Sequence, residues 1–399
     1  MARPPVVRHD APMPAARTRP PRHHCLAVCA PGLEELCAAE LTGMGLRLRR
    51  RFPGGVEFSA SDRELYHVNL WSHVATRVVV RVATFEARSF AELEQGAAGV
   101  AWERWVPDGT TPRVRVSSTA SVLYHSDAVA ERLAVVAGRG PESGSLLVVR
   151  LIHNRVTLSV DSSGEPLHRR GWRSDVAKAP LRETLAAAAL LASGWDRDAP
   201  LVDPFCGSGT IPIEAALLAA GRAPGVGRHF GFEDWPSFQP GTWASVTAAT
   251  KAPAADAVHR PLIMGTDRDE GAVRAAQANA ARAGVADLVD FVHAPLSDME
   301  SPAAPRGWLV SNPPYGKRIG GNGDLRDLYA RLGDIARARM AGWELALLVA
   351  DERLARQGRL RWQARLRTTN GGIPVVLLWA QVGADRPSPS GPAPSSEGG

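Results

Sequence analysis

The chain contains no apolar run that approaches the roughly 18–20 residues needed for a membrane-spanning helix. Its first residues hold prolines and arginines without an apolar centre, which argues against a secretory signal. Only four cysteines occur, and the spacing of Cys25, Cys29 and Cys37 matches no zinc knuckle. We therefore expect a cytoplasmic protein with reduced thiols, no metal centre and no membrane helix.

Lysine is almost missing, so arginine supplies nearly all of the 47 basic residues. The net charge of +6 and the isoelectric point near 9.5 favour a polyanionic partner. GC-rich coding is an alternative cause, because it raises arginine, alanine, glycine and proline together. With 399 residues, of which 45% are hydrophobic, the chain is long enough for two or three domains.

A glycine turn lies near the middle of the chain. Residues 201–203 predict the end of a strand, 204–210 a turn with two glycines, and 211–220 a helix. Glycines let the backbone approach a ligand closely, and a helix start offers free N–H groups. The turn is not a P-loop, because no Lys-Ser/Thr follows it, and it lacks the third glycine of a dinucleotide site.

A second loop follows the apolar residues 308–310, which suit a buried strand. Two prolines stop that strand, so Asn312, Pro313, Pro314 and Tyr315 form a stiff loop at its carboxyl end. Ligands of open α/β sheets bind at that edge. One amide, backbone carbonyls and one ring suit a flat group that bears an NH2. A proline-rich turn with a packed tyrosine is the alternative.

Together the two stretches resemble a known family. Asp203-Pro-Phe-Cys-Gly-Ser-Gly-Thr followed by Asn312-Pro-Pro-Tyr-Gly is similar to class I S-adenosylmethionine-dependent methyltransferases that act on exocyclic amines. The similarity is greatest to the THUMP-domain group, the 23S rRNA and tRNA guanine-N2 methyltransferases, and spans residues 25–382. It implies S-adenosylmethionine as cofactor, structured RNA as partner and N2-methylguanosine as product.

The resemblance also assigns roles to residues. It implies Asn312, Pro313 and Tyr315 as catalytic residues and Pro314, Tyr315, Lys317, Arg318, Arg113 and Arg115 as substrate-binding residues. The cofactor-binding residues that it implies are Asp203, Phe205, Cys206, Gly207, Gly209, Thr210, Asp267 and Asn312.

Asp267 ends a predicted strand at 262–267, and a carboxylate there has two acceptors for two vicinal ribose hydroxyls. The alternative is a helix cap, a role that Asp269 can take. One position departs from the family. The acid that usually contacts the adenine amine is replaced by Ala294-Pro295, and the spacing of Asp298 does not suit a substitute.

The implied architecture has four parts. Residues 1–24 are predicted to be a disordered basic arm, 25–165 a ferredoxin-like and THUMP RNA-binding region, 166–383 the methyltransferase domain and 384–399 a disordered tail. The fold class is α/β, with a Rossmann-like seven-stranded sheet that ends in an antiparallel hairpin, preceded by an α+β region. Within the RNA-binding region the candidates for phosphate contact are Arg113, Arg115, His125, Arg150 and Arg155.

An aromatic insert at 222–262 is predicted to be a packed flap; a base-stacking surface is the alternative. A DNA adenine or protein glutamine methyltransferase would use the same loop chemistry. A non-catalytic RNA-binding protein with a decayed cofactor site is a third possibility, supported only by Ala294-Pro295. The sequence does not separate ribosomal from transfer RNA, and it leaves the oligomeric state open.

Overall fold

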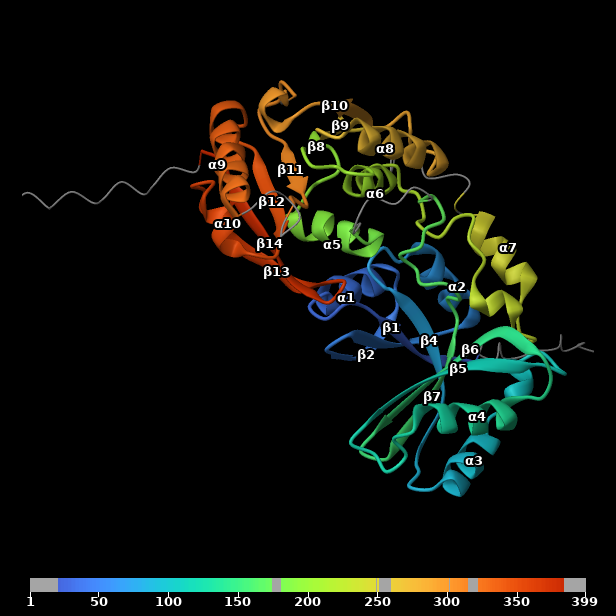
Figure 1. The fold of residues 1–399 in the computed structure, drawn as a ribbon. Coiled ribbons are helices and arrows are strands. Elements are labelled where there is room, and N and C mark those ends of the chain that lie inside the picture. The colour runs from blue at the N-terminus through green and yellow to red at the C-terminus, as the bar shows by residue number, and fades with distance from the viewer. Residues whose placement is uncertain are drawn as a thin grey trace, which may run out of the picture.

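Two seven-stranded sheets organise the chain (Figure 1). The computed structural model describes residues 21–173, 181–248, 250, 260–300, 302–314 and 322–383, with the backbone alone at 322–324. Residues 1–20 of the predicted arm and the whole predicted tail lie outside these residues. Residues 21–24 of the arm are described, and His23 and His24 already belong to the first strand. Within the described residues, no helix combines the length and the apolar character needed to cross a membrane.

The N-terminal sheet runs without a break through the ferredoxin-like region and the predicted THUMP region. Its strand order is β2-β3-β1-β4-β7-β6-β5. The strands are β1 (His23–Val28), β2 (Arg47–Phe52), β3 (Gly55–Ala60), β4 (Arg77–Glu86), β5 (Thr111–Thr119), β6 (Glu142–Ile152) and β7 (Arg155–Asp161). The long strands β4 and β7 pair with each other and so join the two regions.

Alternation along these strands gives the sheet one apolar face and one polar face. Residues in register across six strands form a buried apolar row: Phe58, Cys25, Val80, Val160, Leu147 and the half-buried Val114. The adjacent row points to the other side and is mostly polar: Ser59, His24, Arg81, Ser159, Val148 and Arg115. Side chains of neighbouring residues alternate between faces, so the second row defines what we call the open face.

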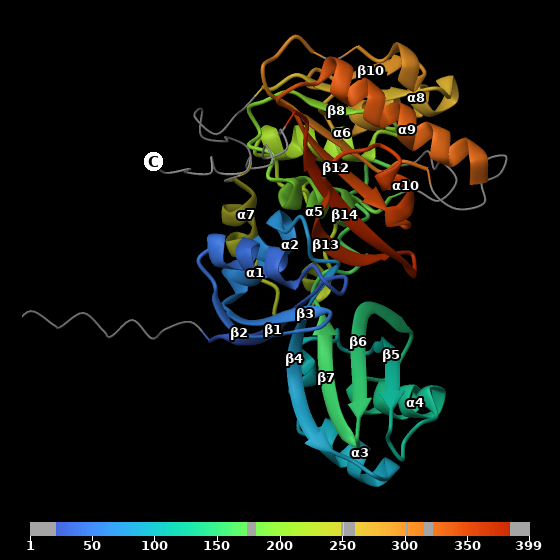
Figure 2. The ribbon, with the colours of Figure 1, turned by 90° about the vertical axis from the view of Figure 1, so that its left-hand side faces the viewer.

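Four helices cover the apolar face. They are α1 (Glu34–Gly43), α2 (Asp62–Trp71), α3 (Phe90–Ala98) and α4 (Ser126–Ala137), and a short 3-10 turn, η1, spans Trp102–Arg104. Figure 2 shows α3 and α4 behind the strands β4 to β7. Ser61 begins α2 with a reciprocal capping box to Glu64, as its position in the sequence predicts. The order β1-α1-β2-β3-α2-β4 is that of a ferredoxin-like unit, in which β2 forms the edge of the sheet.

The C-terminal sheet has the order β10-β9-β8-β11-β12-β14-β13. Neighbouring strands of this sheet are parallel, except that β14 pairs antiparallel with both β12 and β13. The predicted antiparallel hairpin at the end of the domain is therefore confirmed. The strands are β8 (Leu201–Asp203), β9 (Ile263–Asp267), β10 (Asp290–His293), β11 (Trp308–Ser311), β12 (Glu344–Val349), β13 (Gln363–Asn370) and β14 (Ile373–Gln381).

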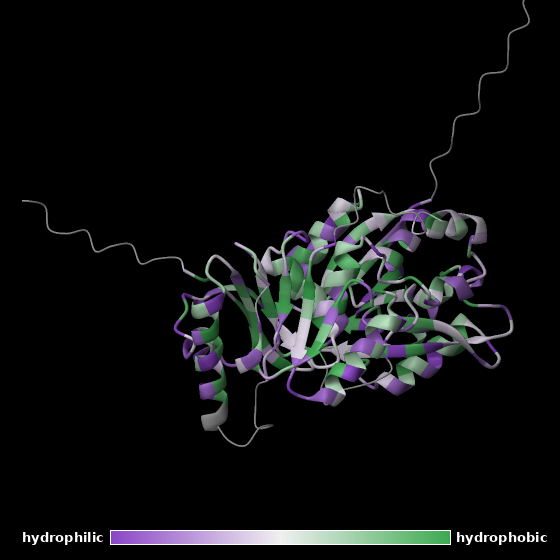
Figure 3. Cartoon of the chain, turned by 90° about the horizontal axis from the view of Figure 1, so that it is seen from above, coloured by the Kyte–Doolittle hydropathy of each residue, from purple (hydrophilic) through white to green (hydrophobic). Residues whose placement is uncertain are grey.

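Helices cover both sides of this second sheet, and its central strands are accordingly mostly apolar, with Asp203 and Ser311 at the carboxyl ends of β8 and β11 (Figure 3). Leu201, Val310 and Ala346 belong to the core on one side, with α5 (Glu183–Ser193), α6 (Thr210–Ala219) and α8 (Glu270–Arg282). Val202, Leu309 and Leu345 belong to the core on the other side, with the short turn η4 (Leu296–Asp298), α9 (Asn322–Arg339) and α10 (Glu352–Arg356). This is the predicted class I methyltransferase sheet.

The aromatic insert packs between the two halves. Phe230, Phe232 and Trp235 are buried, and the Phe232 ring stacks on Tyr66 of α2 with 4.2 Å between centroids. The insert contains a short 3-10 turn, η2 (Gly231–Asp234), and α7 (Pro240–Ala248), which packs on α2. The prediction of a packed flap is confirmed, and the rings are not available as a surface for bases.

Arg170 links the two halves through a buried network. Its guanidinium pairs with Glu214 on α6 at 3.3 Å and donates to the backbone oxygens of Ser72, His73 and Leu167 at 2.8–3.3 Å. Burial raises the pKa of Glu214, but the positive charges of Arg170 and His73 outweigh it and hold that pKa below its usual value. Arg170, which the sequence did not single out, therefore fixes the N-terminal region to the helix that begins at the glycine turn.

Replacing Arg170 by methionine should lower the free energy of unfolding by about 3–5 kcal/mol, because Glu214 would remain as an unpaired buried charge. Urea unfolding followed by tryptophan fluorescence measures this loss. Arg169→Met is the matched control, since its ion pair with Glu165 is exposed and should cost less than about 0.5 kcal/mol. The double variant Arg170→Met/Glu214→Leu should recover most of the stability. Equal losses for the two arginines would contradict the assignment.

Candidate active site

The glycine turn connects β8 to α6 at the carboxyl edge of the sheet. Gly207 and Gly209 have φ values of +53° and +86°, in the left-handed region that side chains other than glycine adopt at a cost. A Cβ on Gly209 would lie 2.9 Å from both the Cβ of Ala276 and the Cζ of Phe291. The turn therefore packs tightly on α8 and β10, and its backbone is brought to the edge where β8 ends.

Asp203 lies at the base of this turn and is almost fully buried. One carboxylate oxygen accepts hydrogen bonds from the Phe205 N–H, at 3.1 Å, and from the Ser311 hydroxyl. Burial raises the pKa of Asp203 to about 7, against the two hydrogen bonds, and the charge of Asp267 raises it further. The Ser311 contact joins the glycine turn to the start of the proline loop.

Asn312 follows β11 directly and so lies beside the end of β8, with which β11 pairs. Its side-chain oxygen is buried and has no hydrogen-bond partner among the described residues. Pro313 is buried and Pro314 half-buried. Tyr315, Lys317 and Arg318 lie outside the described residues. A buried amide oxygen without a partner carries a free-energy cost, and a ligand N–H at this position would remove it.

Asp267 ends β9 on the other side of β8. Its two carboxylate oxygens accept from the Gly207 N–H at 2.9 Å and from the Asp269 N–H at 3.0 Å. Each oxygen has a second lone pair, so the carboxylate retains acceptors for two hydroxyl groups. Asp269 caps α8 through the N–H groups of Gly271 and Ala272, which leaves Asp267 free of that role, as predicted.

The remaining predicted residues lie either in the glycine turn or on strand β5 of the N-terminal sheet. Phe205 is half-buried in the turn, and burial raises the pKa of the Cys206 thiol, which makes it a poor nucleophile. The Thr210 hydroxyl accepts a hydrogen bond from Arg173 at 2.6 Å. Arg113 and Arg115 lie on β5 of the N-terminal sheet, far from this edge (Figure 1). All four cysteines are free and buried.

Three residues near this edge were not singled out from the sequence. Ser311 bonds to Asp203, and Arg173 pairs with Glu183 at 3.3 Å beside the start of α5. Burial raises the pKa of Glu183 to about 7, although Arg173 opposes the shift. A charged residue at the start of an otherwise apolar helix is the one feature of the sequence that could have identified Glu183.

Ala294 and Pro295 directly follow β10 in the structure. The Ala294 N–H donates to the backbone oxygen of Asp267 at 3.1 Å, and the Asp298 side chain is exposed in η4. Among the described residues no cluster of histidine, cysteine and acidic side chains could hold a metal ion.

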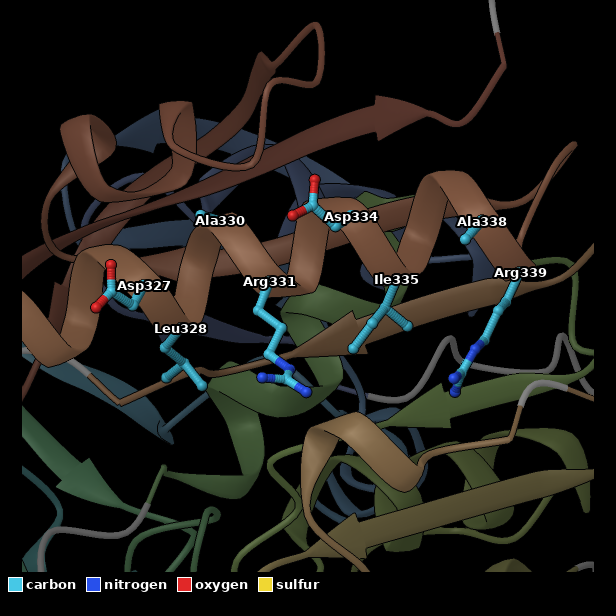
Figure 4. A pocket seen from close by; sticks show the side chains of 8 residues that line it. All are labelled: Asp327, Leu328, Ala330, Arg331, Asp334, Ile335, Ala338 and Arg339. Atoms are coloured by element: carbon cyan, nitrogen blue, oxygen red, sulfur yellow. The ribbon is translucent and has the colours of Figure 1, made fainter.

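A groove with a volume of about 670 Å³ runs along α9 and is lined by residues of that helix alone, so it is separate from the candidate active site. Leu328, Arg331, Ile335 and Arg339 project to one side of the helix there (Figure 4). None of the predicted site residues lines this groove.

Comparison with known proteins identifies the chain. Residues 170–377, just over half of it, match the family described as "RMKL-like, methyltransferase domain". The chain belongs to the RMKL-like methyltransferase family. Residues 24–79 of this methyltransferase also match the RlmL ferredoxin-like domain, which agrees with the first part of the N-terminal sheet.

Two curated relatives differ in length. "Putative RNA methyltransferase slr0064" of Synechocystis sp. is 35% identical over 378 residues, which are 91% of this chain and 97% of the relative. "Ribosomal RNA large subunit methyltransferase K/L" of Marinomonas sp. is 34% identical over 367 residues, 86% of this chain and 51% of the relative. The methyltransferase thus spans almost all of the first relative and about half of the second.

Two solved structures support the fold, and one of them supports the cofactor. SMU.472, complexed with SAH, superposes with a TM-score of 0.83 at 28% identity and covers 92% of this chain and 99% of its own. A "predicted N6-adenine-specific DNA methylase" from Listeria monocytogenes gives 0.82 at 30% identity, with 91% and 97% covered. The cofactor is S-adenosylmethionine, and the tight glycine turn, the Asp267 acceptors and the partnerless Asn312 oxygen fit such a ligand.

Gly209→Ala should destabilise the protein by about 3 kcal/mol, because it adds left-handed strain of about 1–2 kcal/mol to a contact with Ala276 and Phe291. Gly207→Ala is the matched control, since a Cβ there meets nothing within 4 Å and only the strain remains. Chemical denaturation measures both. A Gly209 variant that is no less stable than the Gly207 variant would show that the close packing is absent.

Asp203→Asn should change how stability depends on pH. A folded pKa of about 7, above the unfolded 3.8, means that the folded protein retains a proton that the unfolded chain releases, so stability falls as pH rises between these values. The amide removes this loss. Between pH 5 and pH 8 the variant should gain on the order of 2 kcal/mol relative to wild type.

Denaturation at the two pH values tests this, with the exposed Asp287→Asn as control. Parallel pH profiles for wild type and Asp203→Asn would exclude a buried carboxyl that is hard to ionise.

Proposed function

We propose that this methyltransferase transfers a methyl group from S-adenosylmethionine to the exocyclic amine of a guanine in structured RNA, giving N2-methylguanosine. The names of the curated relatives support an RNA substrate, and one of them is named for large-subunit ribosomal RNA. The sequence motif around Asn312 supports an amine as the acceptor. Ribosomal and transfer RNA both remain within this proposal.

The observation that carries the proposal is the buried Asn312 oxygen, which has no hydrogen-bond partner in the part of the chain that the structure describes. An aromatic amine is a weak nucleophile, because its lone pair is delocalised into the ring. The Asn312 oxygen and the Pro313 carbonyl accept its two N–H groups, turn the lone pair out of conjugation and stabilise the positive charge that develops. When bound, S-adenosylmethionine supplies an electrophilic methyl group on its sulfonium.

Positioning supplies much of the rate of such a displacement, since nucleophile, methyl carbon and leaving sulfur must be nearly collinear. The methylated amine is acidic and loses its proton to solvent, so no strong base is required. Tyr315 stacks on the base once it has left its helix, and Lys317 and Arg318 contact flanking phosphates.

The cofactor lies along the carboxyl edge of the sheet in this proposal. Asp267 accepts the two ribose hydroxyls, and the backbone of Gly207 and Gly209 allows close approach. Asp203, Phe205, Cys206 and Thr210 complete the cradle around the rest of the ligand. Because Ala294-Pro295 provides no carboxylate, backbone groups recognise the adenine.

The proposal is tested with purified protein, isotope-labelled S-adenosylmethionine and RNA from a strain that lacks the gene. We expect label in RNA, and N2-methylguanosine on digestion to nucleosides. The Listeria name favours a second candidate, methylation of adenine N6 in DNA. Duplex DNA in a parallel reaction separates the two, since labelled N6-methyladenine there would replace the guanine proposal. Absent binding of the cofactor in calorimetry would instead favour a non-catalytic protein.

Asn312→Ala should lower kcat by about 100-fold or more, because one preorganised acceptor of the developing charge is lost. Affinity for RNA, measured by filter binding, should change little, since binding depends on many other contacts. Single-turnover rates with saturating RNA isolate the chemical step. Unchanged turnover in this variant would remove the basis of the proposed mechanism.

A further inference from the structure

The open face of the N-terminal sheet has a recess at its end farthest from the methyltransferase domain. The recess has a volume of about 430 Å³ and is lined by Glu86, Arg150, Ile152, His153, Arg155 and Thr157. Pairing in register places Thr157 opposite Arg150, and Arg155 opposite both Ile152 and Glu86. Figure 2 shows this end of β4, β7 and β6 close to α3.

The charged side chains of the recess have no partners. Among the described residues, Glu86, Arg150 and Arg155 form no ion pair and no side-chain hydrogen bond, although Glu86 and Arg155 lie on paired strands. Farther along the same face, Glu57 pairs with Arg81, and Asp161 pairs with Arg77. With two arginines and one glutamate, the recess keeps a net positive charge, and the exposed Arg115 on β5 of the same face also forms no ion pair among the described residues.

Exposed apolar side chains gather at the same tip. Of the eight large apolar residues that are exposed in the described chain, three are here: Val122, Tyr124 and Ile152. Tyr124 is 68% exposed, is the one aromatic among the eight, and lies with its ring 4.1 Å from that of His125. A large exposed ring on a loop that adjoins a recess with unpaired charges marks a contact surface.

Hydrogen bonds hold this loop against the recess. Asn154 accepts the Val122 N–H on its side-chain oxygen at 2.8 Å, and its own N–H donates to the Ser121 hydroxyl at 3.0 Å. His153 and Asn154 form a tight hairpin turn with φ values of +49° and +65°. The ring and the two arginines are thus presented by a fixed backbone.

We propose that this tip, formed by residues 121–125 and the recess, is a second RNA contact site that takes one unpaired nucleotide. Arg150 and Arg155 contact phosphates, and Tyr124 stacks on the base. Arginines next to an exposed aromatic ring complement single-stranded nucleic acid, in which every base has a face for stacking and every linkage a charge. The site rests on the proposed RNA substrate and lies at the opposite end of the molecule from Asn312 (Figure 1).

Filter binding of a large-subunit ribosomal RNA transcript over a range of salt concentrations tests the site. The double variant Arg150→Ala/Arg155→Ala should bind less tightly and show a shallower dependence of log K on log salt, by about 1.4 for two phosphate contacts at about 0.7 each. Tyr124→Ala should lower affinity by about 10-fold with the salt dependence unchanged, and Tyr124→Phe should bind like wild type.

Arg139→Ala is the matched control, since this exposed arginine precedes β6 and the recess lies at the opposite end of that strand. Calorimetry with S-adenosylmethionine should give wild-type affinity for all variants. A wild-type salt dependence in the double arginine variant, or equal affinities of the alanine and phenylalanine variants at 124, would overturn the site alone. Absence of RNA binding by wild type would overturn both this site and the proposed substrate.

Discussion

The ion pair between Arg170 and Glu214 connects the two halves of this methyltransferase, and its position has consequences for both. Glu214 lies one helical turn after Thr210, where α6 leaves the glycine turn, and Arg170 also holds the backbone of residues 72 and 73 in the N-terminal region. A buried charge pair tolerates little change in geometry, because separation of the partners leaves a charge without compensation. The surface that would grip RNA is therefore held in a defined orientation relative to the cofactor turn.

A few contacts between strand ends also bring the residues of the active site together. Parallel strands bring their carboxyl ends to one edge, so Asp203, Asp267 and Asn312 meet although they are far apart in the sequence. The Ser311 hydroxyl and the Gly207 N–H then connect these three strand ends through hydrogen bonds to Asp203 and Asp267. The side-chain oxygen of Asn312 takes no part in this network and has no hydrogen-bond partner among the described residues. A turn that was merely packed would leave no such acceptor, so this oxygen indicates a ligand-binding position.

The N-terminal sheet, unlike the C-terminal sheet, is covered on only one of its faces by helices that the structure describes. Its apolar row faces four helices, whereas its polar row is left open. On this open face Arg77 and Arg81 are neutralised by acidic partners, whereas Arg150 and Arg155 at the tip form no ion pair among the described residues. The aromatic insert, which composition alone left as either a flap or a stacking surface, is used to seal the junction of the two halves. Exposed aromatic surface is instead provided by Tyr124 on a short loop.

The sequence by itself determined the two motifs, the class of sheet and the order of domains, because glycine turns, paired prolines and strand periodicity are local properties. It did not indicate β2, because four of the six residues of this strand are arginines and an apolar alternation is missing. β2 is an edge strand that pairs only with β3. The sequence indicated Arg150 and Arg155 as candidates for phosphate contact, but not Arg170, Ser311 or the place of Tyr124 at the tip, since burial and missing partners depend on residues brought together from distant parts of the chain. Only the tertiary structure decided which charges are neutralised and which remain free, because ion pairing depends on distances that no local pattern encodes.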